Sequence, residues 1–345
     1  MSKKALIISH IHVWDKQNKG DVAIVLAVQQ LLRSRFSGVK IKDFPVESLK
    51  TFNRRRLDQI NRSDLVVFGG GGLFYNYFLP FEQKMITAIK PPLVIFGVGY
   101  IQEIGAPELS PAKSKSLLNL IRKARLIGVR DFYTRNFLIK QGVKPAKIDL
   151  IGDPAILLSE SKPAKLKLSA GMKIGLNLNY SGWLGFGLWR QDILKAYQDL
   201  AHYFIQQYRA QIYYLKHHPG EDNIYPELKI PGLKIIDLSP AEQKYAYGQL
   251  DLVVGMMLHA SVLAFGAITP EINVAYDRRN YGFAKFIGCP ELVIDLAKLK
   301  SGQLLKTAKQ VFANHERYLV KFMRRRRLVR SYQSGFLDKI EKLFG

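Results

Sequence analysis

Short apolar segments alternate with longer one-sided segments along most of the 345-residue chain, and this alternation constrains the fold more than any other feature. Each apolar segment is rich in Val, Ile and Leu and ends at a glycine or a polar residue, which is typical of buried strands. Strands that alternate with helices form parallel sheets with helices on both faces. The chain is therefore expected to be an α/β protein.

The pattern occurs twice. In the first half the predicted strands are Ala5–Ser9, Val39–Phe44, Leu65–Gly69, Leu93–Gly97 and Leu126–Val129. A helix is predicted over Val22–Arg35, with Asp21 placed to cap its free N–H groups. In the second half the predicted strands are Lys173–Leu178, Gln211–Leu215, Lys234–Leu238, Asp251–Gly255 and Glu271–Tyr276. The helices predicted there are Asp192–Tyr208, Pro240–Gly248, Leu258–Ala267 and Leu304–Asn314.

A segment rich in Lys, Ser and Pro separates the two halves. The predicted domains are a Rossmann-like domain over 1–158, a linker over 159–170, a second Rossmann-like domain over 171–314 and a C-terminal helix over 315–345. Two such domains that face each other across a cleft form the GT-B arrangement. Ligands in these sheets bind beyond the carboxyl ends of the strands.

The C-terminal segment from Glu316 to Phe344 is predicted to be one long helix. Its apolar stripe repeats every seven residues at Phe322, Val329, Phe336 and Leu343, with Tyr318, Tyr332 and Ile340 beside it. We expect this stripe to pack back onto the first domain. A run of four arginines, 324–327, interrupts the segment and is expected to be a solvated face.

The net charge of +24 exceeds what folding requires and therefore bears on partners. Nucleic acid, anionic lipid and phosphorylated substrates all fit it, although no nucleic-acid-binding signature is present. The single cysteine, Cys289, fits a reducing compartment. No apolar stretch approaches the ~18 residues of a membrane span, so a cytoplasmic protein is expected. Any contact with an anionic membrane would be peripheral, through the basic C-terminal helix.

His259 is the first candidate for chemistry. It follows the predicted strand Asp251–Gly255 and stands in the first turn of the next helix. Helix N-termini favour anions, and an anion bound there would raise the pKa of the imidazole. His259 then becomes a proton donor. A structural histidine is the competing interpretation.

Five further segments end predicted strands at the same sheet edges. They are the acceptor-side residues Asn18, Gly20 and Asp21, the glycines Gly69, Gly70, Gly71 and Gly72, Arg130, the pair Arg278 and Arg279, and the run Lys216, His217 and His218. The glycines can hold an anion or form a tight turn before a helix. Arg130 can face the cleft or pair with Asp131 or Asp153. The spacing of His217 and His218 matches no zinc motif, so no metal is expected.

In this order the segments resemble the polysaccharide pyruvyl transferase family. The matching segments are Asn18–Asp21, Asp64–Gly72, Gly97–Gly99, Val129–Asp131 with Thr134, Gly152–Ala155, Asp251–His259 and Ala275–Gly282, which span the chain from its first strand to about Cys289. The resemblance implies a GT-B-like fold and transfer of the enolpyruvyl unit of phosphoenolpyruvate (PEP) to a sugar as a pyruvate ketal. No other cofactor is implied.

The resemblance also implies roles for individual residues. His259 would be the general acid, and Arg130 and Arg279 would bind PEP together with Met257, Leu258 and Arg278. The family typically has arginine where this chain has Met257. Loss of one charged anchor costs on the order of 1.5–3 kcal/mol, or more than tenfold in binding. Arg278, Arg190 or Lys216 could supply the charge, or the chain uses another donor.

Two other functions stay open at this point. A nucleotide-sugar glycosyltransferase on the same fold would place a diphosphate at the helix start near His259. A basic binding protein without catalysis is the third alternative. The sequence does not identify the acceptor sugar, the linkage or the oligomeric state. Asp21 and Asp15 are candidates for the base that activates the sugar hydroxyl.

Overall fold

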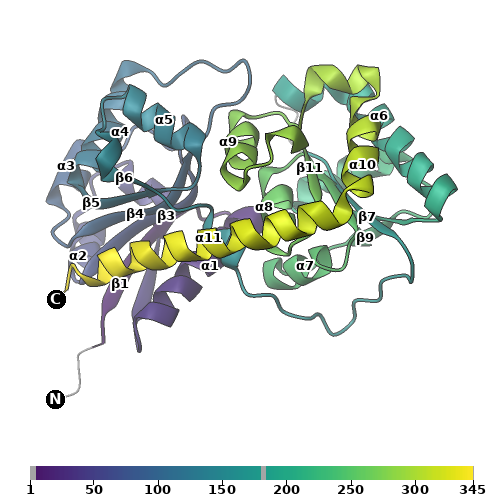
Figure 1. Cartoon of the computed structure of the whole chain (residues 1–345). Helices are drawn as coiled ribbons and strands as arrows, with labels where there is room; N and C mark the ends of the chain where they lie inside the picture. Colours follow the sequence, from purple (N-terminus) through teal and green to yellow (C-terminus); the bar gives the residue numbers. More distant parts are fainter. Residues whose placement is uncertain (1–4, 180–183, 345) are drawn as a thin grey trace.

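A computed structural model describes residues 5–179 and 184–344 and shows two six-stranded, fully parallel sheets side by side (Figure 1). The strands of the first sheet lie in the order β2-β1-β3-β4-β5-β6. Their bounds are β1 Ile7–His12, β2 Lys40–Pro45, β3 Leu65–Phe74, β4 Leu93–Tyr100, β5 Ala124–Val129 and β6 Ile148–Leu150. The strand order reverses between β1 and β3, which makes this the switch point where ligands bind in such sheets.

The helices of the first domain connect these strands. They are α1 Lys19–Arg35, α2 Arg54–Asn61, α3 Gln83–Ala88, α4 Pro111–Lys123 and α5 Phe132–Lys140, with short 3-10 helices η1 Val46–Leu49, η2 Pro145–Lys147 and η3 Pro154–Leu157. Successive residues of β3 face opposite layers: Leu65 and Val67 pack into one core cluster, and Val66 and Phe68 into the other. Helices on both faces therefore bury the whole sheet.

The second sheet has the order β12-β11-β10-β7-β8-β9, and its switch point lies between β7 and β10. Its strands are β7 Lys173–Asn177, β8 Gln211–Leu215, β9 Lys234–Ile236, β10 Leu252–Gly255, β11 Glu271–Ala275 and β12 Val293–Asp295. The helices are α6 Leu184–Tyr208, α7 Pro240–Tyr247, α8 Leu258–Gly266, α9 Arg278–Ile287 and α10 Gln303–Ala313. The 3-10 helices are η4 Pro219–Asn223, η5 Tyr225–Leu228, η6 Pro290–Leu292 and η7 Leu296–Ser301.

The glycine-rich segment differs from the expectation. Gly69–Gly72 continues β3 as a strand, and no helix begins directly after it. Gly69 and Gly71 pair with Phe96 and Val98 of β4 and have φ values of 146° and 90°. These conformations suit glycine alone, so the turn interpretation was wrong because pairing with β4 outweighs the local turn preference.

The start of α1 also differs. Helix α1 begins at Lys19 rather than Val22, and its N-cap is Asn18, whose side chain accepts from the N–H groups of Gly20 and Asp21. Asp21 therefore lies inside the first turn and is not the cap. Its carboxylate is therefore available for contacts with groups beyond the carboxyl end of the sheet.

Helix α11, His315–Glu341, begins over the second domain and ends beside the first, as predicted (Figure 1). Phe322, Val329 and Phe336 are buried, and the Phe336 ring contacts Phe96 of β4 at a centroid distance of 5.5 Å. Gln333 donates to the carbonyl oxygen of Asp153 at 3.2 Å. The apolar stripe is thus used within the chain, and α11 fastens the two domains together.

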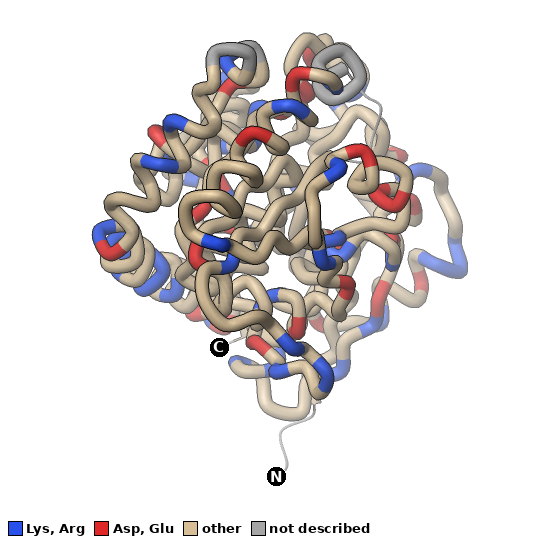
Figure 2. Tube along the Cα trace, turned by 90° about the vertical axis from the view of Figure 1, so that its right-hand side faces the viewer, with Lys and Arg blue, Asp and Glu red and all other residues tan. Residues whose placement is uncertain are grey.

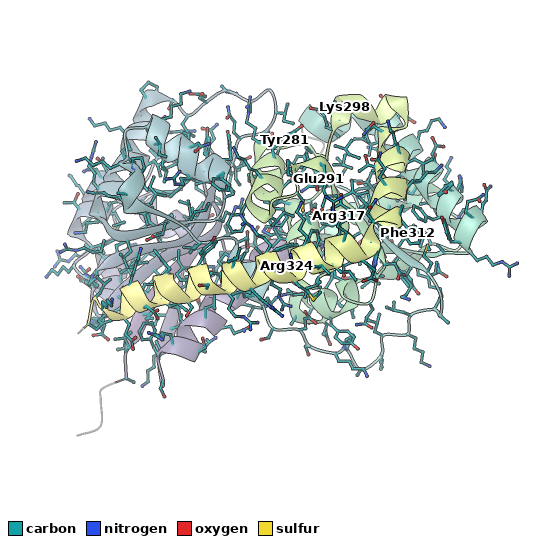
Figure 3. All side chains as sticks on the ribbon, in the orientation of Figure 1. Tyr281, Glu291, Lys298, Phe312, Arg317 and Arg324 are labelled. Atoms are coloured by element: carbon teal, nitrogen blue, oxygen red, sulfur yellow. The ribbon has the colours of Figure 1, made fainter. Side chains whose placement is uncertain are left out.

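The arginine run on α11 is only partly a solvated face. Arg324 and Arg327 are exposed, and Figure 3 shows Arg324 on the same helix as Arg317. Arg325 instead donates from Nε to the carbonyl oxygen of Phe286 at 2.8 Å, and Arg326 is half-buried. The middle of the run therefore holds α11 against the second domain.

A buried lysine ties α7 to the segment between the sheets. The Lys244 Nζ donates to the carbonyl oxygens of Ile156 and Leu158, each at 2.7 Å. Burial and the neighbouring Arg326 lower the pKa of Lys244 to about 7. A neutral amine has two N–H donors, which match the two carbonyl acceptors.

The Lys244 pKa predicts a pH-dependent stability. Between pH 7 and the unfolded value of 10.5 the unfolded chain binds more protons at this residue, so the free energy of unfolding rises with pH. From pH 7.5 to 9.5 the wild type should gain on the order of 2 kcal/mol over Lys244→Met in urea unfolding. Lys306→Met, at an exposed position, is the control and should follow the wild type. Parallel curves for wild type and Lys244→Met would contradict the neutral buried amine.

Among residues 5–179 and 184–344, no helix combines the length and the apolar character that a membrane span requires.

Candidate functional site

The candidate site lies where the carboxyl ends of both sheets meet. Helix α8 starts at the switch point of the second sheet, and its N-cap, Met257, is held by a 3.1 Å hydrogen bond from its N–H to Asn177 Oδ1 at the end of β7. This contact fixes the first turn of α8, which carries His259. The side chain of Met257 is itself buried.

The imidazole of His259 packs directly against the first turn of α1. A Cβ placed on Gly20 would lie 2.1 Å from His259 Nδ1, so the contact requires a residue without a side chain. Glycine at this position is therefore explained by close approach between the domains, and not by a turn. The His259 residue is only 7% exposed.

Arg130 enters the site from the end of β5 and is 2% exposed. Its Nη1 lies 3.2 Å from Asp153 Oδ2, and its Nε lies 3.4 Å from Asp131 Oδ2. The guanidinium also packs on Gly99, where a Cβ would lie 2.2 Å from Nε. The sequence left open whether Arg130 faces the cleft or pairs with Asp131 or Asp153. The side chain is buried near His259 and also pairs with the two carboxylates.

Arg279 approaches from α9. Its Nε lies 2.9 Å from Oδ1 of the buried Asp277, which also caps this helix. Its Nη1 lies 3.5 Å from a Cβ placed on Gly72, and the Oδ1 of Asp21 lies 3.9 Å from one placed on Gly71. Arg279 and Asp21 therefore lie beside the glycines of β3, while the close contact that a Cβ on Gly72 would make is with Ile101, at 2.2 Å.

The charges of this cluster act on each other. Burial, Arg130, His217 and Arg279 together lower the pKa of His259 well below its usual value, so the ring is neutral at pH 7 without a ligand. Burial and the carboxylate of Asp15 raise the pKa of Asp21 to about 7. A carboxyl that titrates near neutral pH suits a general base.

Several buried polar atoms at this point make no hydrogen bond within the described residues. Within the described part of the chain, Arg130 Nε and Nη2 and His259 Nε2 have no hydrogen bond. Buried polar atoms are almost always hydrogen-bonded, so each exception calls for an explanation. A bound anionic ligand that accepts from Arg130 and His259 would satisfy all three.

The side chains of the predicted 216–218 run make contacts within the second domain. Lys216 Nζ lies 2.8 Å from Asp222 and 3.2 Å from Asp237. His217 is fully buried, with Nε2 2.7 Å from the hydroxyl of Tyr247. His218 Nδ1 accepts from the N–H of Gly220 at 2.9 Å. The carbonyl oxygens of Lys216 and His217 accept from Lys19 of the first domain. The acceptor-side role of the three residues stays a prediction.

Two arginines considered as substitutes for the missing one lie elsewhere. Arg278 is exposed and lines a separate hollow with Tyr133 and Tyr281. Arg190 is half-exposed and forms an ion pair with Glu227, with Nε 3.0 Å from Oε2. The charges that act on His259 are those of Arg130 and Arg279.

Direct hydrogen bonds close the two domains over the site. Lys19 Nζ donates to the carbonyl oxygen of Lys216 at 2.8 Å and to Gln243 Oε1 at 3.0 Å. On the other side the N–H of Arg278 donates to the carbonyl oxygen of Gln102 at 3.3 Å. The two domains are therefore in direct contact on both sides of the site.

Sequence reasoning missed residues that matter here. Asn177 and Asp277 orient α8 and α9, and only their places at strand ends could have drawn attention to them.

A second group, His10, His12 and Asp43, brings metal-ligating side chains together in the first domain. The i, i+2 spacing of the two histidines on a strand was the available signal.

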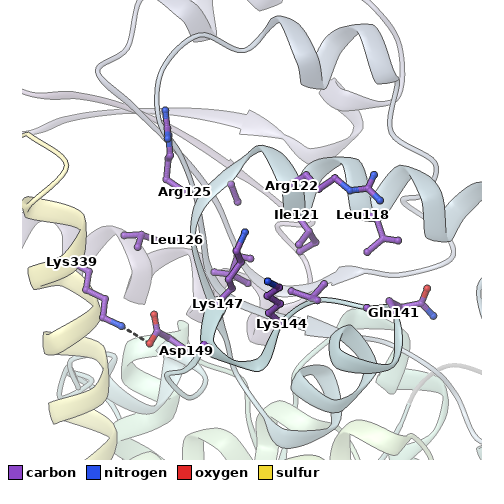
Figure 4. A pocket seen from close by; sticks show the side chains of 15 residues that line it. Leu118, Ile121, Arg122, Arg125, Leu126, Gln141, Lys144, Lys147, Asp149 and Lys339 are labelled. Carbon is purple, nitrogen blue, oxygen red and sulfur yellow. Dashed lines mark hydrogen bonds and ion pairs between the residues drawn. The ribbon is translucent and has the colours of Figure 1, made fainter.

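A basic hollow of about 500 Å³ lies at the amino ends of β5 and β6, away from His259 (Figure 4). Arg122, Arg125, Lys144, Lys147 and Lys339 line it. Figure 4 shows Lys339 of α11 directed at Asp149, and their ion pair measures 2.6 Å. This hollow is separate from the cluster around Arg130.

Two solved proteins with a similar architecture were each determined with bound UDP. The chain superposes on *S. aureus* MnaA solved with UDP (TM-score 0.60, 11% identity, 92% of this chain and 90% of that one). It also superposes on *Anabaena* HepE solved with UDP and glucose (TM-score 0.58, 11% identity, 98% of this chain and 100% of that one). Identities this low establish the GT-B-like fold alone.

Sequence comparison identifies the family. The amylovoran biosynthesis protein AmsJ of *Erwinia amylovora* is 19% identical over 290 residues, which are 75% of this chain and 68% of that protein. The family model described as polysaccharide pyruvyl transferase matches residues 18–278, which are well over half of the chain. The chain is a transferase that belongs to the polysaccharide pyruvyl transferase family.

Proposed function

We propose that the chain transfers a pyruvyl group from PEP to a sugar of a cell-surface polysaccharide or its precursor, forming a pyruvate ketal. The observation that carries the proposal is that, within the described residues, Arg130 Nε and Nη2 and His259 Nε2 are buried and make no hydrogen bond. A guanidinium with two donors that make no hydrogen bond matches a carboxylate or phosphate oxygen pair. PEP carries both groups, and its reacting carbon would lie beside His259.

The residues have separate roles in the proposed reaction. His259, protonated once the anion is bound, gives its proton to the methylene carbon of PEP while a sugar hydroxyl adds to the neighbouring carbon. Asp21 takes the hydroxyl proton. A second hydroxyl then displaces inorganic phosphate and closes the ketal. Arg130 and Arg279 hold the phosphate and carboxylate, and the transfer step calls for no other cofactor.

Incubation with labelled PEP and candidate glycans tests the proposal. The expected products are a labelled glycan ketal and one phosphate for each pyruvyl group transferred. Calorimetry with PEP alone tests the donor site independently of the acceptor. Absence of both a ketal product and PEP binding would remove the proposal.

Met257→Arg is expected to strengthen PEP use. Met257 stands at the N-cap of α8 beside His259, and an arginine there would add a charged anchor for the donor. One charge-assisted hydrogen bond contributes about 1.5–3 kcal/mol, so PEP affinity should rise about tenfold or more. Met257→Gln is the matched control, because it is long and polar without a charge. Unchanged affinity in Met257→Arg would mean that Arg130 and Arg279 already complete the anion site.

A nucleotide-sugar glycosyltransferase is the second candidate, because solved proteins of the same architecture hold UDP. The start of α8 would then bind a diphosphate. Thermal-shift measurements with UDP, UDP-sugars, GDP-sugars and PEP separate the two candidates. A shift with a nucleotide sugar and none with PEP would favour the glycosyltransferase.

We further propose that a lipid-linked acceptor brings the protein to an anionic membrane surface. The charge of +24 supports this, and Figure 2 shows Lys and Arg positions distributed along the chain trace. Each well-placed basic residue contributes about 1 kcal/mol near an anionic surface. Co-sedimentation with phosphatidylserine vesicles, but not with phosphatidylcholine vesicles, is the expected result. Equal sedimentation with DNA at physiological salt would instead favour a general basic binding protein.

A further inference from the structure

Two histidines and an aspartate meet on the neighbouring strands β1 and β2 of the first sheet, outside the site around His259. His10 and His12 lie on one face of β1, and Asp43 lies on the neighbouring strand β2, opposite His10 in the register. His12 Nε2 lies 3.1 Å from Asp43 Oδ1, and His10 Nδ1 lies 3.9 Å from the same oxygen.

Backbone carbonyls fix the tautomers of both rings. His10 Nε2 is hydrogen-bonded to the carbonyl oxygen of Gly69, and His12 Nδ1 lies 2.6 Å from that of Val13. A carbonyl oxygen only accepts, so these two nitrogens carry the hydrogens. In a neutral ring the other nitrogen then bears a lone pair. Both lone pairs face the Asp43 carboxylate.

This arrangement lacks a positive charge at its centre. Two lone pairs and a carboxylate repel one another unless a cation lies between them. The ring of His10 is fully buried, and within the described residues its Nδ1 has no hydrogen-bond partner. A buried nitrogen directed at a carboxylate that cannot donate to it requires an explanation.

We propose that His10 Nδ1, His12 Nε2 and the Asp43 carboxylate bind a divalent transition-metal ion, with Zn²⁺ as the expected ion. Two imidazole nitrogens and one carboxylate are a ligand set that zinc takes, with a fourth position left for water. Metal-binding histidines commonly donate their second N–H to a carbonyl, as both rings do here. Gln29 Nε2 donates to Asp43 Oδ1 at 2.6 Å and orients the carboxylate in the same way.

The geometry allows the ion with a small adjustment. The three ligand atoms lie within 4.8 Å of one another, and a tetrahedral zinc site needs separations of about 3.3 Å. The Asp43 side chain is 38% exposed on the edge strand β2, so it is free to move toward the buried rings. The ion would join β1 to β2 and, through His10 and Gly69, to β3.

Metal titration of the tag-free full chain after EDTA treatment tests the proposal. Zn²⁺ should bind with one ion per chain in calorimetry and raise the thermal unfolding temperature. Co²⁺ should give the visible absorption of a site with nitrogen and oxygen ligands. His12→Ala and Asp43→Ala should each weaken Zn²⁺ binding at least about 100-fold.

His202→Ala removes an exposed histidine on α6 and should bind Zn²⁺ like the wild type. His12→Gln, which keeps a donor for the Val13 carbonyl, serves if His12→Ala does not fold, and should also lose the ion. Two results would overturn the proposal. One is no stoichiometric Zn²⁺ binding by the wild type. The other is equal binding by the wild type and the Asp43→Ala variant.

Discussion

Replacing His259 with asparagine should slow pyruvyl transfer by on the order of 100-fold or more, because the proposed proton donor to PEP is lost. The rate with saturating PEP and acceptor is the measurement. His259 is buried with an unpaired Nε2, so asparagine removes no hydrogen bond within the described chain. The fold should therefore persist, as a thermal unfolding curve would verify. His202→Asn, at an exposed site, is the control and should keep the wild-type rate.

The same residue sets the pH dependence of PEP binding. Without ligand the pKa of His259 lies well below its usual 6.5, and a bound anion raises it. PEP binding near pH 7 should therefore take up protons, and affinity should fall as pH rises through the pKa of the complex. Calorimetry in two buffers of different ionisation enthalpy measures this uptake. Full transfer activity in His259→Asn, or the same uptake, would assign the proton to another group.

Local pattern was enough to predict the two sheets, because each strand carries its own apolar signal. The strand Gln211–Leu215 has the predicted bounds, and α11 crosses to the first domain as expected, with Phe336 on Phe96, although Phe322 packs on Phe265 of the second domain. The extent of β3 was not predictable in this way. Four glycines favour a turn locally, and only their pairing with β4 extends the strand to Phe74. The pairing of β3 with β4, a non-local contact, therefore determines where β3 ends.

The site residues were likewise predictable where a local sequence signal marks them, and not where a non-local contact places them. His259 and Arg130 could be selected from their places at strand ends, since such ends meet at one edge. Which partners surround them depends on how the domains face each other. The sequence does not reveal that Gly20 covers the His259 ring, or that His217 turns toward Tyr247. His10 and His12 were overlooked because the first strand was expected to end at Ser9, whereas β1 extends to His12.

Gly20→Ala is expected to damage both stability and activity, although it replaces a helical glycine by the best helix former. The added Cβ would lie 2.1 Å from Nδ1, 2.4 Å from Cγ and 2.7 Å from Cβ of the His259 side chain. The ring must therefore shift, or the domains must part. Overpacking of this kind costs about 1–3 kcal/mol, measured as the free energy of unfolding in urea. Transfer activity should fall with it, because the ring that moves is the proposed proton donor.

Gly335→Ala provides the matched control on α11, where a new Cβ meets nothing within 4 Å. There the same substitution should stabilise the protein by about 0.4–1 kcal/mol, since it reduces the entropy of the unfolded chain. The two variants share one chemical change and differ only in what the methyl group meets. If Gly20→Ala were instead as stable and active as Gly335→Ala, the first turn of α1 could not rest on His259 in solution. The closed contact between the domains would then not be the resting state of the enzyme, and PEP would find the Arg130 donors already accessible.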